Sequence, residues 1–103
     1  NYDEMLFYAY GYSTLSDTNK KRLDLIAEHI KASDKQVFRV DGFADKQTGS
    51  QRANERLAGK RARIAADYLV SKGVERSRLD VRNCGTTDCP FGKPAHNRIV
   101  VVY

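Results

Sequence analysis

The chain has 103 residues, a formal charge of +5 at neutral pH and 41% hydrophobic residues. This length supports one domain with a real core and is too short for two, and no apolar run approaches the length of a membrane span, so a soluble, globular domain is predicted. The positive charge is compatible with nucleic acid, anionic lipid headgroups or a carboxylate-rich polymer as the partner, and does not choose among them.

The first half of the chain predicts a strand, a helix and a second strand. Residues 5–10 are rich in aromatic side chains, as strands often are. Ser16 is suited to cap the following helix, whose apolar stripe is Leu23, Ile26, Ala27 and Ile30. Residues 37–44 alternate with period two, which favours a strand with one buried face. This succession favours a parallel strand pair with a right-handed crossover.

The second half predicts a long helix and two further strands. A polar loop at residues 45–50 leads into a helix over about residues 52–72, which Gly73 ends. Residues 79–83 form a short strand, and residues 99–103 are apolar throughout, as in a central strand buried on both faces. The expected fold is therefore α/β, a two-layer sandwich of helices on a small mixed parallel and antiparallel sheet, with residues 1–103 in one domain.

An acid at the end of a strand and an arginine within the apolar stripe of the next helix form the most informative pattern. Asp45 comes directly after the alternating strand. Arg61 falls on a stripe with Asn54 on the same side, formed by Leu57, Ile64, Ala65 and Tyr68. Leaving an inward-leaning guanidinium unpaired would cost several kcal/mol. The pattern predicts an ion-binding pair or, alternatively, an internal salt bridge between strand and helix.

Positive charge is concentrated on the same predicted helix, at Arg52, Arg56, Lys60, Arg61 and Arg63. Of the charged residues there, Arg56, Lys60, Arg63 and Asp67 fall on the side away from Leu57. A solvated helix surface is the simplest interpretation of these four.

Two cysteines, Cys84 and Cys89, flank a short loop. A disulfide across this loop would add roughly 2 kcal/mol in the chain-entropy model and would imply an oxidising compartment such as the periplasm. Free thiols are an alternative. A metal site with His96 as a third ligand is another, although the spacing matches no common zinc pattern. We predict a structural disulfide and no metal.

These residues resemble the OmpA-like, peptidoglycan-binding domains of Gram-negative outer-membrane proteins, lipoproteins and flagellar stator proteins. The family pattern is matched in order by Gly42, Asp45, Gly49, Asn54, Leu57, Arg61 and Ala62, with Asn97 and Arg98 opening the final strand. Residues 7–23 resemble the family's first strand and the loop into its first helix. The resemblance covers nearly the whole chain.

The resemblance implies a non-enzymatic module, without a cofactor, that binds the diaminopimelate residue of the peptidoglycan stem peptide. Asp45 would accept hydrogen bonds from the ligand ammonium, and Arg61 would hold its carboxylate. Asn54 would orient Arg61 or add a ligand contact, and Arg98 is a further candidate. Such a module would tether an outer-membrane protein to the wall from the periplasm, as a mature module or an excised domain of a longer protein.

Some positions depart from the family pattern. Phe43 and Ala44 stand where histidine and threonine are usual, Ala58 replaces a helix serine, and Ile99 replaces a second arginine. These departures leave the acid and the helix arginine in place. They therefore affect the fine specificity for the ligand more than the ligand class.

No pattern for catalysis is found. His29 and His96 lack an activating partner in the sequence, and there is no phosphate loop, metal-ligand cluster or dinucleotide fingerprint. The alternatives to wall binding are a basic nucleic-acid-binding domain, suggested by the charge and the six tyrosines, and a periplasmic protein-interaction module. The oligomeric state does not follow from the sequence.

Overall fold

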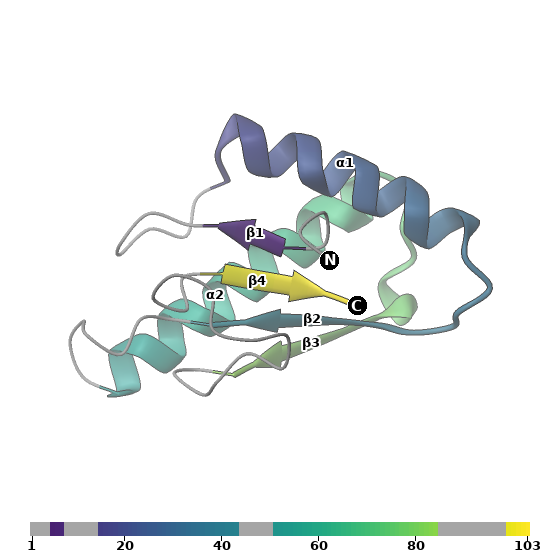
Figure 1. The fold of residues 1–103 in the computed structure, drawn as a ribbon. Coiled ribbons are helices and arrows are strands. Elements are labelled where there is room, and N and C mark those ends of the chain that lie inside the picture. The colour runs from purple at the N-terminus through teal and green to yellow at the C-terminus, as the bar shows by residue number, and fades with distance from the viewer. Residues whose placement is uncertain (1–4, 8–14, 44–50, 85–98) are drawn as a thin grey trace.

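The computed structural model describes residues 5–7, 15–43, 51–84 and 99–103. Within these ranges the elements, in chain order, are β1 (Met5–Phe7), α1 (Asp17–Ala32), β2 (Phe38–Gly42), α2 (Gln51–Ser71), the 3-10 helix η2 (Arg76–Arg78), β3 (Leu79–Asn83) and β4 (Ile99–Val102). The strands form one mixed sheet in the order β1-β4-β2-β3, in which β2 is parallel to β3 and antiparallel to β4, and β4 is antiparallel to β1 (Figure 1). The predicted sandwich of helices on a small mixed sheet is confirmed.

Helix α1 begins at the predicted cap, and α2 begins and ends close to the predicted positions. Ser16 caps α1, because its hydroxyl accepts a hydrogen bond from the backbone N–H of Asn19 at 3.1 Å. At the end of α2, Gly73 has a φ of 101°, a left-handed conformation that glycine adopts readily. The helices are joined by the Tyr68 hydroxyl, which donates to Asp24 at 2.8 Å.

The main core lies between the sheet and the two helices, which cover the same face. The predicted apolar stripe of α1 is buried in this core. The core residues are Leu23, Ile26, Ala27, Ile30, Phe38, Val40, Ala62, Ala65, Leu69, Val74, Val100 and Val102. Strand β4 lies between β1 and β2 and is buried along its whole length. The predicted strand of residues 99–103 is thus one residue too long, because Tyr103 follows β4 and is half-buried. The expected pairing of the first two strands is wrong, because β4 separates them.

The buried line of α2 is displaced from the predicted stripe. Ala58, Ala62, Ala65, Ala66 and Leu69 are fully buried, whereas Leu57, Ile64 and Tyr68 are only half-buried. The cause is the close approach of α2 to β2 at Gly42, where a Cβ atom would lie 2.0 Å from the carbonyl oxygen of Ala58. The helix therefore meets the strand through its smallest side chains.

Candidate functional site

Three strands end at the edge of the sheet where β4 begins. Phe7 of β1 pairs with Ile99, the first residue of β4. The Phe43 N–H donates to the Ile99 carbonyl at 2.9 Å, and the Cys84 N–H donates to the Gly42 carbonyl at 2.9 Å. Figure 1 shows β1, β2 and β3 pointing the same way and β4 pointing the opposite way. Ligands of open α/β sheets bind beyond the carboxyl ends of strands, so this edge is the candidate site.

Helix α2 carries Arg61 to this edge. The side chain is fully buried, and its Nη1 donates to the carbonyl oxygen of Phe43 at 2.9 Å. A carbonyl is a neutral acceptor, so this bond positions the guanidinium without cancelling its charge. The burial confirms the prediction that Arg61 leans inward from the helix.

The first turns of α2 extend past the end of β2. Gly42, the last residue of β2, contacts Ala58 of α2. The helix starts at Gln51, seven residues before Ala58, so its first turns extend about 10 Å beyond this contact along the helix axis. Figure 1 shows this overhang. Asn54 belongs to the overhanging turns. The end of β1, the end of β2 and the start of α2 thus lie at this edge.

The predicted site residues are only partly within the described ranges. Arg61 lies within these ranges, and Asn54 is placed as a member of α2. Asp45, Arg98 and Cys89 lie outside the described residues. The pairing of Asp45 with Arg61 therefore stays a prediction, as do the ligand contacts of Asn54 and Arg98.

Cys84 comes directly after β3 and is half-buried at the same edge. Burial raises the pKa of its thiol, and the negative charge of Asp41 raises it further. Cys84 is the one cysteine within the described part of the chain, so its disulfide with Cys89 stays a prediction.

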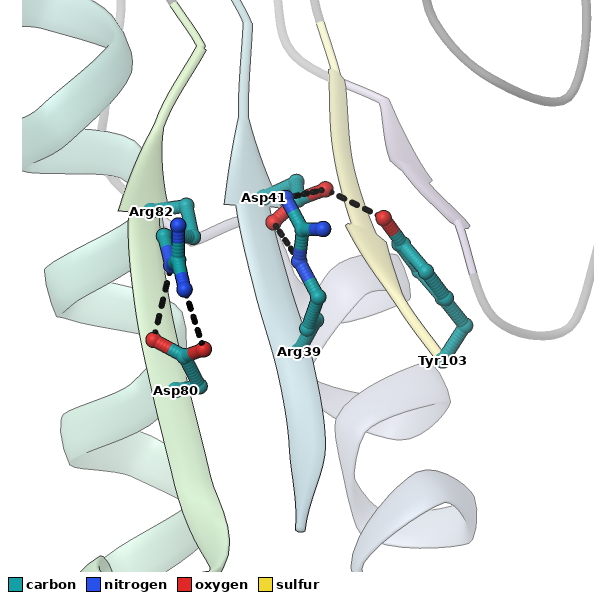
Figure 2. Close-up of polar contacts among 5 residues, drawn as sticks. All are labelled: Arg39, Asp41, Asp80, Arg82 and Tyr103. Atoms are coloured by element: carbon teal, nitrogen blue, oxygen red, sulfur yellow. Dashed lines mark hydrogen bonds and ion pairs between the residues drawn. The ribbon is translucent and has the colours of Figure 1, made fainter.

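Sequence reasoning misses a buried acid on the sheet face away from the helices. Asp41 is 1% exposed. Arg39 Nε donates to its Oδ1 at 3.2 Å and the Tyr103 hydroxyl donates to its Oδ2 at 2.7 Å (Figure 2). Burial, followed by the hydrogen bond to Asp41, raises the pKa of Tyr103 to about 12. The sequence signal that could have indicated this position is the alternation of side chains along β2, which puts Asp41 on the face opposite Val40.

A second ion pair lies beside this cluster on β3. Arg82 donates two parallel hydrogen bonds to Asp80, each of 2.9 Å (Figure 2), and this contact lowers the pKa of the Asp80 carboxyl. In the β2–β3 register Arg39 is opposite Asp80, and Asp41 is opposite Arg82. Opposite charges in such cross-strand pairs stabilise a sheet, so these four charged residues stabilise the pairing of β2 with β3 next to the candidate site.

Within the described part of the chain, no group of three or more His, Cys, Asp or Glu side chains could hold a metal ion. Nor does a helix within those ranges have the length and apolar character needed to cross a membrane. His29 is exposed, with its ring edge-on to that of Phe38 at a centroid distance of 6.2 Å, and His96 lies outside the described residues.

Comparison with known sequences gives one family match and several relatives. The model of the OmpA family matches residues 7–98. Outer membrane protein 41 of Porphyromonas gingivalis is 36% identical over 78 residues, which cover 75% of this chain and 19% of that protein. The peptidoglycan-binding protein ArfA of Mycobacterium tuberculosis is 30% identical over 86 residues, which cover 78% of this chain and 26% of that protein. The chain thus spans about a fifth to a quarter of these relatives.

Solved structures share the fold at low sequence identity. The OmpA-like domain of FopA1 from Francisella tularensis has a TM-score of 0.83 at 23% identity, covering 95% of this chain and 68% of that one. The peptidoglycan-associated lipoprotein from Burkholderia pseudomallei has a TM-score of 0.83 at 19% identity, covering 96% of this chain and 87% of that one. At these identities the likeness concerns the fold alone.

Proposed function

The chain belongs to the OmpA family, and we propose that it binds peptidoglycan non-covalently through the diaminopimelate residue of the stem peptide. Its function is binding and not catalysis. The observation that carries the proposal is the fully buried guanidinium of Arg61, fixed by Phe43 at the edge where three strands end. Two of its relatives and neighbours are named as a peptidoglycan-binding protein and a peptidoglycan-associated lipoprotein.

The chemistry of the ligand suits an acid and an arginine held close together. Meso-diaminopimelate carries an ammonium and a carboxylate on one carbon at the end of its side chain. Asp45 accepts from the ammonium, and Arg61 binds the carboxylate with its planar fork. The bond to Phe43 uses one of the five N–H donors of Arg61, and a bidentate carboxylate contact needs two others.

Chain connectivity supports a common location for the four ligand residues. Asp45 follows Phe43 by two residues, which limits the distance between their Cα atoms to about 7 Å. Arg98 directly precedes Ile99, which is hydrogen-bonded to Phe43. Asn54 is two helical turns before Arg61 on α2. In this arrangement Asn54 and Arg98 add secondary contacts to the ligand held by Asp45 and Arg61.

The relatives also suggest where the domain works. They include proteins named as outer membrane proteins, and this chain spans only part of their length. We therefore infer a periplasmic domain of a Gram-negative bacterium, attached to the outer membrane through the rest of a longer protein. There it tethers the outer membrane to the wall.

Replacing Asp45 by asparagine should keep the fold and weaken wall binding by one to two decades. The amide has nearly the same shape but cannot neutralise an ammonium, and losing a charged hydrogen-bond partner removes about 1.5–3 kcal/mol. Sedimentation with purified sacculi measures the loss, with circular dichroism as the test of folding. Asp34→Asn, which changes an exposed acid after α1, is the matched control. A folded Asp45→Asn variant that pellets like the wild type would exclude Asp45 as the ligand acid.

The same sedimentation at two salt concentrations separates the alternative functions. A nucleic-acid-binding module would bind nucleic acid with steep salt dependence and would not need Asp45. A periplasmic protein-interaction module would not pellet with purified sacculi at either concentration. A diaminopimelate site should keep much of its binding at high salt, because buried ion pairs are screened less than exposed ones.

We predict that Cys84 and Cys89 are joined in the periplasmic protein, and that reduction leaves the domain folded because the main core lies between the sheet and the helices. Mass spectrometry of the unreduced protein, alkylated after denaturation, tests the pairing. Denaturation matters because the raised pKa of the Cys84 thiol slows alkylation in the folded state and would imitate a disulfide. Two alkylated cysteines would refute the pairing.

A further inference from the structure

A row of basic side chains follows the solvent side of α2. Its members, here called the basic ridge, are Arg52, Arg56, Lys60 and Arg63. All four are exposed, and steps of four, four and three residues align them over about 16 Å of helix. The next charged residue on this side is Asp67, whose carboxylate is already bonded to Arg76 at 2.8 Å. Glu55 is the one acid among residues 51–63.

The stability of α2 does not explain the basic ridge. Arg52 and Arg56, and Arg56 and Lys60, are like charges four residues apart, which destabilises a helix. The first turn of α2 has no acidic residue and carries Arg52, a cation at the positive end of the helix dipole. In contrast, α1 has Asp17 in its first turn and basic residues in its last. Of the two long helices in the described part of the chain, α2 is the one that departs from the favourable charge pattern, so its ridge suits an external polyanion.

We propose that the basic ridge is a second contact surface for the wall, which binds free carboxylates of neighbouring stem peptides while the edge site holds one diaminopimelate. This inference rests on the proposed function. The same helix carries Arg61 on its buried side and the ridge on its solvent side, so one small ligand cannot touch both. A polymer with a carboxylate on each of many stem peptides can reach both sides. Its charge is complementary to the ridge.

A weak contact at the basic ridge can still raise the overall affinity for the wall, because it forms on the same polymer that the edge site already holds. Once the edge site holds one stem peptide, neighbouring stem peptides of the same wall are at high effective concentration, and weak ion pairs add to the overall affinity. Exposed ion pairs are screened by salt, whereas buried contacts are screened less. The ridge should therefore strengthen binding to intact wall at low salt and should not affect binding of a single soluble stem peptide.

The test compares two double variants that remove the same charge. Arg56→Gln/Lys60→Gln neutralises the middle of the ridge, and Lys20→Gln/Lys21→Gln neutralises two exposed lysines on α1. We expect the ridge variant to bind sacculi about fivefold more weakly at low salt, a difference that high salt abolishes. The α1 variant should bind like the wild type. Calorimetric titration with a soluble diaminopimelate-containing peptide should be the same for all three proteins.

Several results would overturn the inference. Equal losses in both double variants would mean that only net charge matters, and no loss in the ridge variant would exclude a wall contact. Vesicles containing phosphatidylglycerol and a random-sequence duplex DNA serve as competing probes. If the wild type preferred either probe to sacculi, and the ridge variant lost that preference, the ridge would belong to a membrane or nucleic acid. Failure of the wild type to bind the soluble peptide would instead contradict the edge site.

Discussion

Replacing Gly42 by alanine should lower the free energy of unfolding by about 2–3 kcal/mol. The added Cβ would lie 2.0 Å from the Ala58 carbonyl oxygen and 3.0 Å from the Ala62 Cβ. Neither atom belongs to a flexible side chain, so α2 itself must move away from β2. Because α2 also carries Arg61 to Phe43, binding to sacculi should weaken together with stability. Urea unfolding and sedimentation with sacculi measure the two effects.

Gly59→Ala on α2 is the matched control, with an expected change of opposite sign. There the added Cβ would meet the end of a flexible side chain, the Asn83 Nδ2 at 3.2 Å. Alanine within a helix is favoured over glycine by up to about 1 kcal/mol. This variant should be at least as stable as the wild type. If Gly42→Ala were equally stable, the close contact between β2 and α2 would not be what positions Arg61.

Two departures from the family pattern are related in the structure. Phe43 and Ile99 stand where histidine and a second arginine are usual, and both are buried in one small apolar cluster with Val101. They are also joined by the hydrogen bond between the two strands. The contact of Phe43 with Arg61 uses its backbone carbonyl, which any residue would supply. Losing the usual histidine therefore does not remove the anchor of Arg61.

The sequence predicts those parts of the fold that depend on local patterns. Ser16 marks a helix start, Gly73 marks a helix end, and the continuous apolar run of residues 99–103 indicates a strand buried on both faces, of which residues 99–102 form β4. Arg61 could be found because a charged residue within an apolar stripe conflicts with its surroundings. Each of these signals lies within a few residues of the feature that it predicts.

Features that depend on contacts between distant segments could not be predicted in this way. The alignment of α2 on β2 depends on the absence of a side chain at Gly42, so the buried line runs through Ala58 and Ala62 rather than Leu57. The buried Asp41 accepts a hydrogen bond from Tyr103, which is 62 residues away in the sequence. Helical and strand periodicity contain no information about such pairs.

The most direct test of the central claim is a calorimetric titration that combines Arg61→Lys with amidation of the ligand carboxylate. Lysine keeps the positive charge but has no planar fork, so it cannot contact the Phe43 carbonyl and both carboxylate oxygens as arginine can. We expect the variant to stay folded by circular dichroism. It should bind a diaminopimelate-containing peptide at least tenfold more weakly, the loss of about 1.5–3 kcal/mol expected for a charged hydrogen bond.

The amidated peptide then completes a double-mutant cycle with four titrations. If Arg61 binds the carboxylate, amidation should weaken binding to the wild type by a similar factor and add little further loss in Arg61→Lys, because both changes break the same contact. If Arg61 only connects helix to sheet, the two changes act independently. Losses that add fully across the cycle would therefore contradict the assignment of Arg61 as the carboxylate ligand.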